Sequence, residues 1–157
     1  MSDWNIEERP NRFPWPPVLL VLFIVLGFAL RAVLPFDVAR TPFSQFTGFV
    51  LIALALALDA WASFTFTRAK TTILPHRGSQ ALVTHGPFAY SRNPIYVGNL
   101  MILVGVGLLA GSLLHVALAP ALAFAIGHFA IRREEAHLAA RFPHEWAEYT
   151  ARVRRWI

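Results

Sequence analysis

The fold is decided by one uncharged stretch in the second half of the chain, 93-NPIYVGNLMILVGVGLLAGSLLHVALAPALAFAIGHFAI-131, which holds no Asp, Glu, Lys or Arg. A single membrane-crossing helix needs only about 20 apolar residues. The stretch is therefore too long for one ordinary span, and Gly111-Ser112 is its best internal turn signal. The sequence predicts a tight hairpin with helical arms over residues 95–110 and 113–131, of which the first is short for a full crossing.

The composition favours a membrane protein over a soluble one. Hydrophobic residues make up 56% of the 157 residues, charged residues make up 15%, and the mean hydropathy is +0.50. Soluble globular domains contain about 45–50% apolar residues, whereas side chains that face lipid need no burial within the protein. We therefore expect a single all-α integral membrane domain over residues 1–157.

Two further apolar segments precede the hairpin. The first covers residues 17–34 and follows a polar segment that lacks the basic start of a signal peptide, so we expect it to stay as an anchor. The second covers residues 44–66 and is interrupted by Asp59. An ionisable residue within a span is a functional candidate; the alternative is a carboxylate that reaches the interface or pairs with an arginine. With the hairpin, these segments predict four transmembrane helices.

The positive charges predict the orientation. The loop at residues 35–43 carries one arginine, whereas the loop at 67–94 carries four basic residues and the tail at 132–157 carries six. Because cytoplasmic segments are enriched in Lys and Arg, we expect the second loop, the tail and both termini to be cytoplasmic, in the inner membrane of a bacterium. The arginines flank the apolar spans instead of forming one soluble face, which argues against nucleic acid as a partner.

The basic tail is predicted to form an amphipathic helix at the membrane interface. Its apolar residues recur at spacings of three, four and seven, as on one face of a helix, and Pro143 forces a break or a new helix start. The residues of this apolar face are Leu138, Phe142, Tyr149, Val153 and Trp156.

Polar residues gather at two places, and the first is the loop at residues 84–98. Asn93 and Pro94 read as the N-cap and first position of the hairpin's first helix. The free amide groups and positive dipole of that helix end, together with Arg92, predict an anion site. The alternative is a plain helix cap beside an arginine that reaches the interface.

The second place is Arg132-Arg133-Glu134-Glu135, just beyond the fourth span. Paired acids under a membrane helix have no role in topology, although exposed ion pairs of little energetic weight are an alternative. Since the two places lie at the two ends of one hairpin, we expect them to be close in space, where they would suit a zwitterionic or polyhydroxylated ligand. Cysteine is absent and no His, Asp or Glu spacing indicates a metal site.

Both places carry motifs that resemble a known family. The first motif is Leu82-Val83-Thr84-x-Gly86-Pro87-Phe88-x-Tyr90-x-Arg92-Asn93-Pro94-x-Tyr96-x-Gly98. The second is Glu134-Glu135-x-x-Leu138. In this order they resemble the isoprenylcysteine carboxyl methyltransferase family, which is akin to the phospholipid N-methyltransferases, over about residues 60–157.

The resemblance implies S-adenosylmethionine as the methyl donor, bound on the cytosolic side, and a lipophilic small molecule of the isoprenoid, lipid or carboxylate type as the acceptor. The cofactor-binding residues that it implies are Gln80, Leu82, Val83, Phe88, Arg92, Asn93, Pro94, Tyr96, Glu134 and Glu135. It names no catalytic residue here.

Two departures from the family pattern bear on the chemistry. Asn93 stands where members often have histidine, and an asparagine cannot act as a general base. Ala130 stands where the eukaryotic carboxyl methyltransferases place an arginine for the acceptor carboxylate, so the acceptor need not be a prenylcysteine. Two other functions stay open: a nicotinamide-dependent membrane reductase, and a non-enzymatic membrane scaffold or sensor with the same fold. The oligomeric state cannot be read from the sequence.

Overall fold

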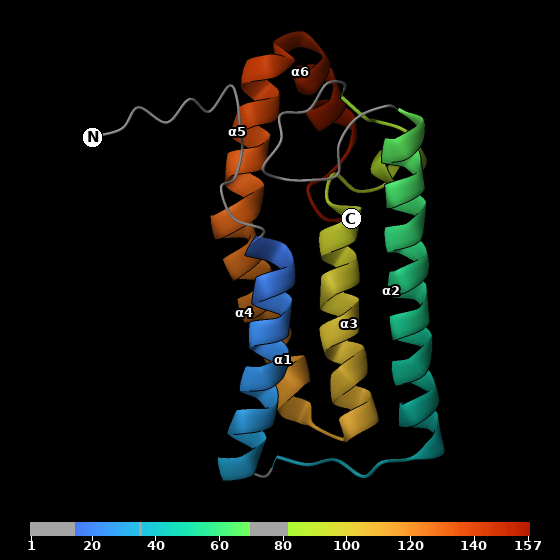
Figure 1. The fold of residues 1–157 in the computed structure, drawn as a ribbon, viewed down its shortest axis with the longest axis vertical. Coiled ribbons are helices and arrows are strands. Elements are labelled where there is room, and N and C mark those ends of the chain that lie inside the picture. The colour runs from blue at the N-terminus through green and yellow to red at the C-terminus, as the bar shows by residue number, and fades with distance from the viewer. Residues whose placement is uncertain (1–14, 35, 70–81) are drawn as a thin grey trace, which may run out of the picture.

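The computed structural model describes residues 15–34, 36–69 and 82–157, and these residues form an all-helical structure. Long helices lie side by side along the longest axis of the molecule, and the last helices of the chain lie at one end of it (Figure 1). The long helices are α1 (Trp15–Val33), α2 (Pro42–Arg68), α3 (Pro94–Ala110) and α4 (Leu113–Ile126). The short ones are η1 (Gly86–Ala89), η2 (Gly127–Ile131), α5 (Arg132–Arg141) and α6 (Pro143–Arg152).

Helix α2 is longer than its apolar pattern predicts, because its start is set by a capping box. The hydroxyl of Thr41 accepts a hydrogen bond from the amide of Ser44 at 3.1 Å, and the hydroxyl of Ser44 accepts one from the amide of Thr41 at 3.1 Å. Pro42 occupies the first turn, where its missing N–H costs nothing. The helix therefore begins at residue 42 and not at 44, and it continues to residue 68.

The turn between α3 and α4 is formed by Gly111 and Ser112, the two residues that predict it. Gly111 has a φ of 67°, a left-handed conformation that glycine adopts without a steric penalty. The amide of Ser112 donates to the carbonyl of Gly107 at 2.8 Å. The loop after α1 also contacts this turn. The amide of Val38 donates to the carbonyl of Gly111 at 3.0 Å, and the amide of Leu113 donates to the carbonyl of Phe36 at 3.2 Å.

The helix that begins at Leu113 does not end at residue 131, where the sequence predicts its end and the charged residues begin. Helix α4 passes through η2, one segment of π-helix, directly into α5, so one apolar helix runs over Leu113–Arg141. By length and composition, this helix, α1 and α2 are each able to cross a membrane, whereas α3 has 17 residues and is shorter. Large apolar side chains such as Phe43, Phe46 and Phe124 are exposed on the outer faces of the helices, as expected for contact with lipid.

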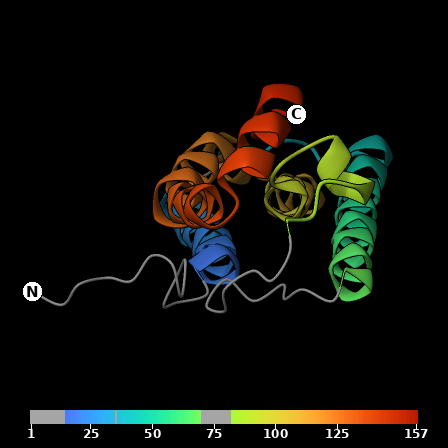
Figure 2. The same cartoon turned by 90° about the horizontal axis from the view of Figure 1, so that it is seen from above.

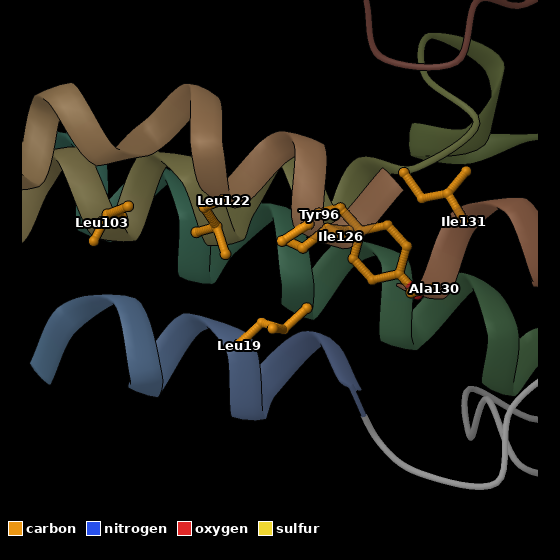
Figure 3. Close-up of a cluster of buried hydrophobic side chains, with 8 residues drawn as sticks. Leu19, Tyr96, Leu103, Leu122, Ile126, Ala130 and Ile131 are labelled. Carbon is orange, nitrogen blue, oxygen red and sulfur yellow. The ribbon is translucent and has the colours of Figure 1, made fainter. Parts of the chain in front are cut away.

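Helix α3 is the centre of the bundle. Helix α2 packs on one flank of it, and α1 and α4 pack on the other (Figure 2). Glycines let α2 and α3 approach closely: a Cβ atom at Gly48 would lie 2.7 Å from the carbonyl oxygen of Gly105. The largest buried cluster lies on the other flank, where Tyr96 and Leu103 of α3 meet residues of α1, α4 and η2 (Figure 3).

Candidate functional site

The two polar places predicted from the sequence meet at one end of the bundle. The first turn of α3, helix η1, helices α5 and α6 and the C-terminus all gather there (Figure 1). Because α3 begins at Pro94 and α4 continues into α5, the hairpin carries the first motif and the acidic pair to the same end.

Tyr96 joins the first motif to the acidic pair. Its hydroxyl donates a hydrogen bond of 2.6 Å to Oε1 of Glu134. The tyrosine ring is buried, with 8% of the residue exposed, and belongs to the cluster that includes Ile126 and Ala130 (Figure 3). The pairing fixes one carboxylate at the boundary between an apolar core and the polar end of the bundle.

Glu135 binds two arginines. Arg155 contacts it bidentately, with Nε 3.0 Å from Oε1 and Nη2 2.5 Å from Oε2, and Nη1 of Arg92 lies 3.3 Å from Oε1. The side chains of Arg92 and Glu135 are 15% and 16% exposed. The hydrogen bond to Glu135 raises the pKa of the Arg155 guanidinium, so this group of one anion and two cations keeps a net positive charge.

Arg92 has donor capacity that Glu135 does not use. Its Nε is buried and has no hydrogen-bond partner among the residues that the structure describes. The guanidinium also lies over the ring of Trp146, 5.7 Å from the ring centroid. A buried donor without a partner is costly, so this atom is one that a bound anionic group would satisfy.

The C-terminal tail closes over the start of α3. The amide of Arg92 donates to the carbonyl of Arg154 at 3.0 Å, and Nδ2 of Asn93 donates to the carbonyl of Arg155 at 2.8 Å. Asn93 thus holds the N-cap position but makes no side-chain cap, and its side chain contacts the tail instead. The amides of Tyr96 and Val97 donate to the carbonyl of Asn93 at 3.0 and 3.1 Å. The expectation of free amides is therefore wrong for Tyr96, whereas the bond from Val97 is the ordinary first hydrogen bond of an α-helix.

The loop before α3 builds a small apolar core against α2. Val83 and Phe88 are buried in it together with Ala62, and the ring of Phe88 lies 4.7 Å from that of Phe66. The hydroxyl of Tyr149 on α6 donates to the carbonyl of Phe88 at 2.7 Å. Burial raises the pKa of Tyr149 to about 12, so the hydroxyl stays a donor at neutral pH. Helix α6 thereby holds η1 in place.

The structure brings most of the expected cofactor residues together. Those at the junction are Arg92, Asn93, Pro94, Tyr96, Glu134 and Glu135, and those in the adjoining loop are Leu82, Val83 and Phe88. Gln80 lies outside the described residues. Pro94 is buried at the start of α3 and Leu82 is half-buried.

Sequence reasoning missed three residues at this end. Ser91 is buried and its hydroxyl accepts from the amide of Asn93 at 3.1 Å, and His137 is 1% exposed on α5. Arg155 was counted only for topology and as part of the tail, although it binds Glu135. A signal existed for His137, which lies one helical turn after Glu134 and therefore on the same helix face.

Ala130 lies in a closed apolar environment. It is 0% exposed and packs in the cluster with Leu19, Tyr96, Ile126 and Ile131 (Figure 3). One helical turn before the acidic pair, the described residues that surround Ala130 in this cluster carry no charged group.

Comparison with known proteins agrees with these motifs. The model of the phospholipid methyltransferase family matches residues 43–145. The cobalt-zinc-cadmium resistance protein CzcN of Cupriavidus metallidurans is 46% identical over 107 residues, which are 68% of this chain and 45% of that protein. The nickel-cobalt-cadmium resistance protein NccN of Alcaligenes xylosoxydans is 41% identical over 106 residues, 68% of this chain and 46% of that protein. The chain thus spans about half the length of the curated relatives it matches. No solved structure matches it.

Proposed function

From the premise that this chain belongs to the phospholipid methyltransferase family, we propose that it is an integral membrane methyltransferase that uses S-adenosylmethionine and acts on a small lipophilic acceptor. The observation that carries the proposal is the junction of the two motifs, in which Tyr96 binds Glu134 and Arg92 binds Glu135. A scaffold would need neither an unpaired buried arginine donor nor a carboxylate held at the edge of the core.

The chemistry of the junction suits the donor molecule. Arg92, with its unsatisfied Nε, would hold the donor's carboxylate, and Glu134 would accept hydrogen bonds from its amino group or ribose hydroxyls. The apolar residues Leu82 and Phe88 would contact the adenine. When bound, the donor supplies a methyl group on a cationic sulfur, which is a good electrophile.

The protein itself then has to align the acceptor with the methyl group and to exclude water. The junction residues Arg92 and Glu134 would hold the donor so that its methyl carbon is open to the lone pair of an acceptor on the side opposite the sulfur. The buried ring of Tyr96 and the apolar cluster beneath it would keep water from the reacting atoms. A lipophilic acceptor would enter sideways from the bilayer, while the donor enters from the water phase.

The membrane arrangement is part of the proposal. We infer four spans, with α3 crossing as the short central helix, and an orientation that places both termini and the junction in the cytoplasm, with α6 at the interface. The loop between α1 and α2 and the turn at Gly111 would lie on the other side. With this orientation we propose the inner membrane of a bacterium as the location; the relatives' source organisms bear only on the kind of organism.

The names of the relatives suggest a physiological setting. Both are named for resistance to divalent metals, and we propose the same setting for this chain, with methylation of a membrane component as its contribution.

A binding experiment in detergent tests the proposed activity. The purified chain is titrated with S-adenosylmethionine, with S-adenosylhomocysteine and with NADPH, using calorimetry and thermal shift. The first two are expected to bind and NADPH is not. Glu134→Gln should weaken donor binding strongly, whereas Glu145→Gln, an exposed acid on α6, should not.

Radiolabelled methyl transfer into a total lipid extract then identifies the acceptor fraction. Binding of NADPH without donor binding would favour a reductase, and binding of neither would favour a scaffold or sensor; each result would reject the methyltransferase.

A further inference from the structure

Asp59 is a carboxylate in the interior of a membrane helix. It lies nine residues before the end of α2 at Arg68, which is about 14 Å along the helix axis. Helix α2 has 27 residues, about 40 Å in length, against a hydrocarbon core of about 30 Å. Asp59 therefore lies inside the apolar layer, where an ionisable group is costly unless it has a partner.

The described residues give one oxygen of this carboxylate no such partner. Its Oδ1 is buried and has no hydrogen-bond donor among the described residues. Two described cations at this end of the bundle make contacts elsewhere: Arg68 lies over the ring of Phe64 at 4.3 Å, and Arg92 binds Glu135. The alternative that Asp59 only pairs with an arginine finds no support in the described part of the chain.

Asp59 is fitted against α3 at a specific point. A Cβ atom at Gly98 would lie 2.8 Å from Oδ1 of Asp59 and 3.5 Å from the carbonyl oxygen of Ala55. Gly98 is the last residue of the first motif, and its lack of a side chain leaves room for the carboxylate. The absence of a side chain at Gly98 thus makes room for Asp59 and also lets α2 and α3 pack closely.

The position of Asp59 relates it to the proposed donor pocket. Ala62 lies one helical turn nearer the cytoplasmic end of α2, and it packs with Val83 and Phe88 in the small core beside the junction. Asp59 is therefore directly on the bilayer side of that core, about 5 Å deeper along α2. A lipid that approached the donor from the bilayer along α2 would meet this carboxylate.

We propose that Asp59 is the specificity-determining residue for the methyl acceptor, and that it binds an acceptor head group that carries a hydrogen-bond donor, an amine or a hydroxyl. This rests on the proposed methyltransferase function. A carboxylate accepts such hydrogen bonds and repels another carboxylate. An acid is therefore disfavoured as the acceptor at Asp59.

The test uses the full chain in detergent, saturated with S-adenosylhomocysteine, and three probes that share one alkyl chain: hexadecylamine, hexadecanol and hexadecanoate. The wild-type chain is expected to bind the amine and the alcohol about tenfold more tightly than the acid, the size of one charged hydrogen bond. Asp59→Asn, which keeps the packing on Gly98, should lose this preference and keep its affinity for S-adenosylhomocysteine. Thr47→Val, on the same helix in the other half of the membrane, is the matched control and should bind as the wild type does.

Two results would overturn the assignment of Asp59. One is equal binding of hexadecanoate and hexadecylamine by the wild-type chain, and the other is an unchanged preference in Asp59→Asn. Failure of the wild-type chain to bind S-adenosylhomocysteine would instead reject the methyltransferase function itself, so the two failures are distinguishable. Transfer rates into lipid extract add a second readout: Asp59→Asn should raise the KM for the acceptor and leave the KM for the donor unchanged.

Discussion

The hydroxyl of Tyr96 lies 2.6 Å from Oε1 of Glu134, although 38 residues separate the two in the sequence. This bond crosses from the first turn of α3 to α5 and therefore closes the polar end of the hairpin. The bond orients the carboxylate of Glu134 against the buried ring of Tyr96.

Removal of the Tyr96 hydroxyl should loosen that carboxylate. In Tyr96→Phe, Glu134 loses a charge-assisted hydrogen bond, and we expect about a tenfold loss of affinity for S-adenosylhomocysteine. Calorimetry in detergent measures the change. Tyr90→Phe is the control, since Tyr90 is 74% exposed. Equal affinities for Tyr96→Phe and the wild type would show that Glu134 needs no orientation.

The group around Glu135 predicts how the tail is held. Glu135→Gln leaves Arg92 and Arg155 without their anion, in a place where the Arg155 side chain is still 44% exposed to water. Because that exposure weakens the pair with Arg155, we expect a loss of about 1–2 kcal/mol in the free energy of unfolding. Limited proteolysis should also cut the chain near residue 153 sooner. Glu148→Gln on the exposed face of α6 serves for comparison. A tail equally resistant in both variants would speak against Glu135 as its anchor.

The bond between Tyr149 and the carbonyl of Phe88 should be measurable as a pH-dependent contribution to the free energy of unfolding. Tyr149→Phe leaves a buried acceptor unsatisfied, which costs about 1–2 kcal/mol. The pKa of Tyr149 is raised from 10.0 to about 12 in the folded chain, so the neutral form is favoured by folding. The contribution is therefore complete below about pH 10 and is lost as the pH rises toward 12.

Thermal unfolding of the wild-type chain and of Tyr149→Phe between pH 8 and 11 measures this contribution. The difference in Tm is expected to be constant up to pH 10 and to shrink above it. A difference that grows with pH would contradict the assigned bond.

Two glycines with opposite surroundings make a paired prediction. Gly86 has a φ of 63°, and a Cβ atom there would lie 2.8 Å from Oγ1 of Thr65. Gly86→Ala should destabilise the chain by about 1–3 kcal/mol and should weaken donor binding, because η1 carries Phe88. A Cβ at Gly127 meets no atom within 4 Å, so Gly127→Ala should leave Tm within about 1–2 °C of the wild-type value. The prediction is refuted by the reverse order of the two Tm values.

Much of the arrangement follows from patterns that act over short distances. The absence of charge over residues 93–131 and the glycine at 111 are enough to predict the hairpin, because a bilayer allows only helices there and glycine alone turns without a penalty. The hairpin's geometry then brings the loop motif and the acidic pair to the same end, whereas the specific contact of Tyr96 with Glu134 does not follow from it. These predictions hold because each depends on one helix or one turn.

Other features depend on contacts that no spacing reveals. The side chain of Asn93 reads as a cap, yet it makes no cap bond, and its Nδ2 instead donates to the carbonyl of Arg155 in the tail that returns from α6. The start of α2 at Pro42 needed recognition of the reciprocal bonds of Thr41 and Ser44, not of hydropathy. Likewise, nothing in the charges after Ile131 shows that α4 continues into α5 without a stop.

The π-helical segment Gly127–Ile131 decides which acid meets the tyrosine. Each such segment inserts one residue without a matching advance around the axis, so everything after it is rotated by about 100° relative to the register of α4. Phase counted from α4 with ordinary helical winding would therefore assign the wrong azimuth to Glu134 and Glu135. The side of the helix on which each acid lies is therefore set by the underwinding of these five residues as well as by the spacing of the residues in the sequence.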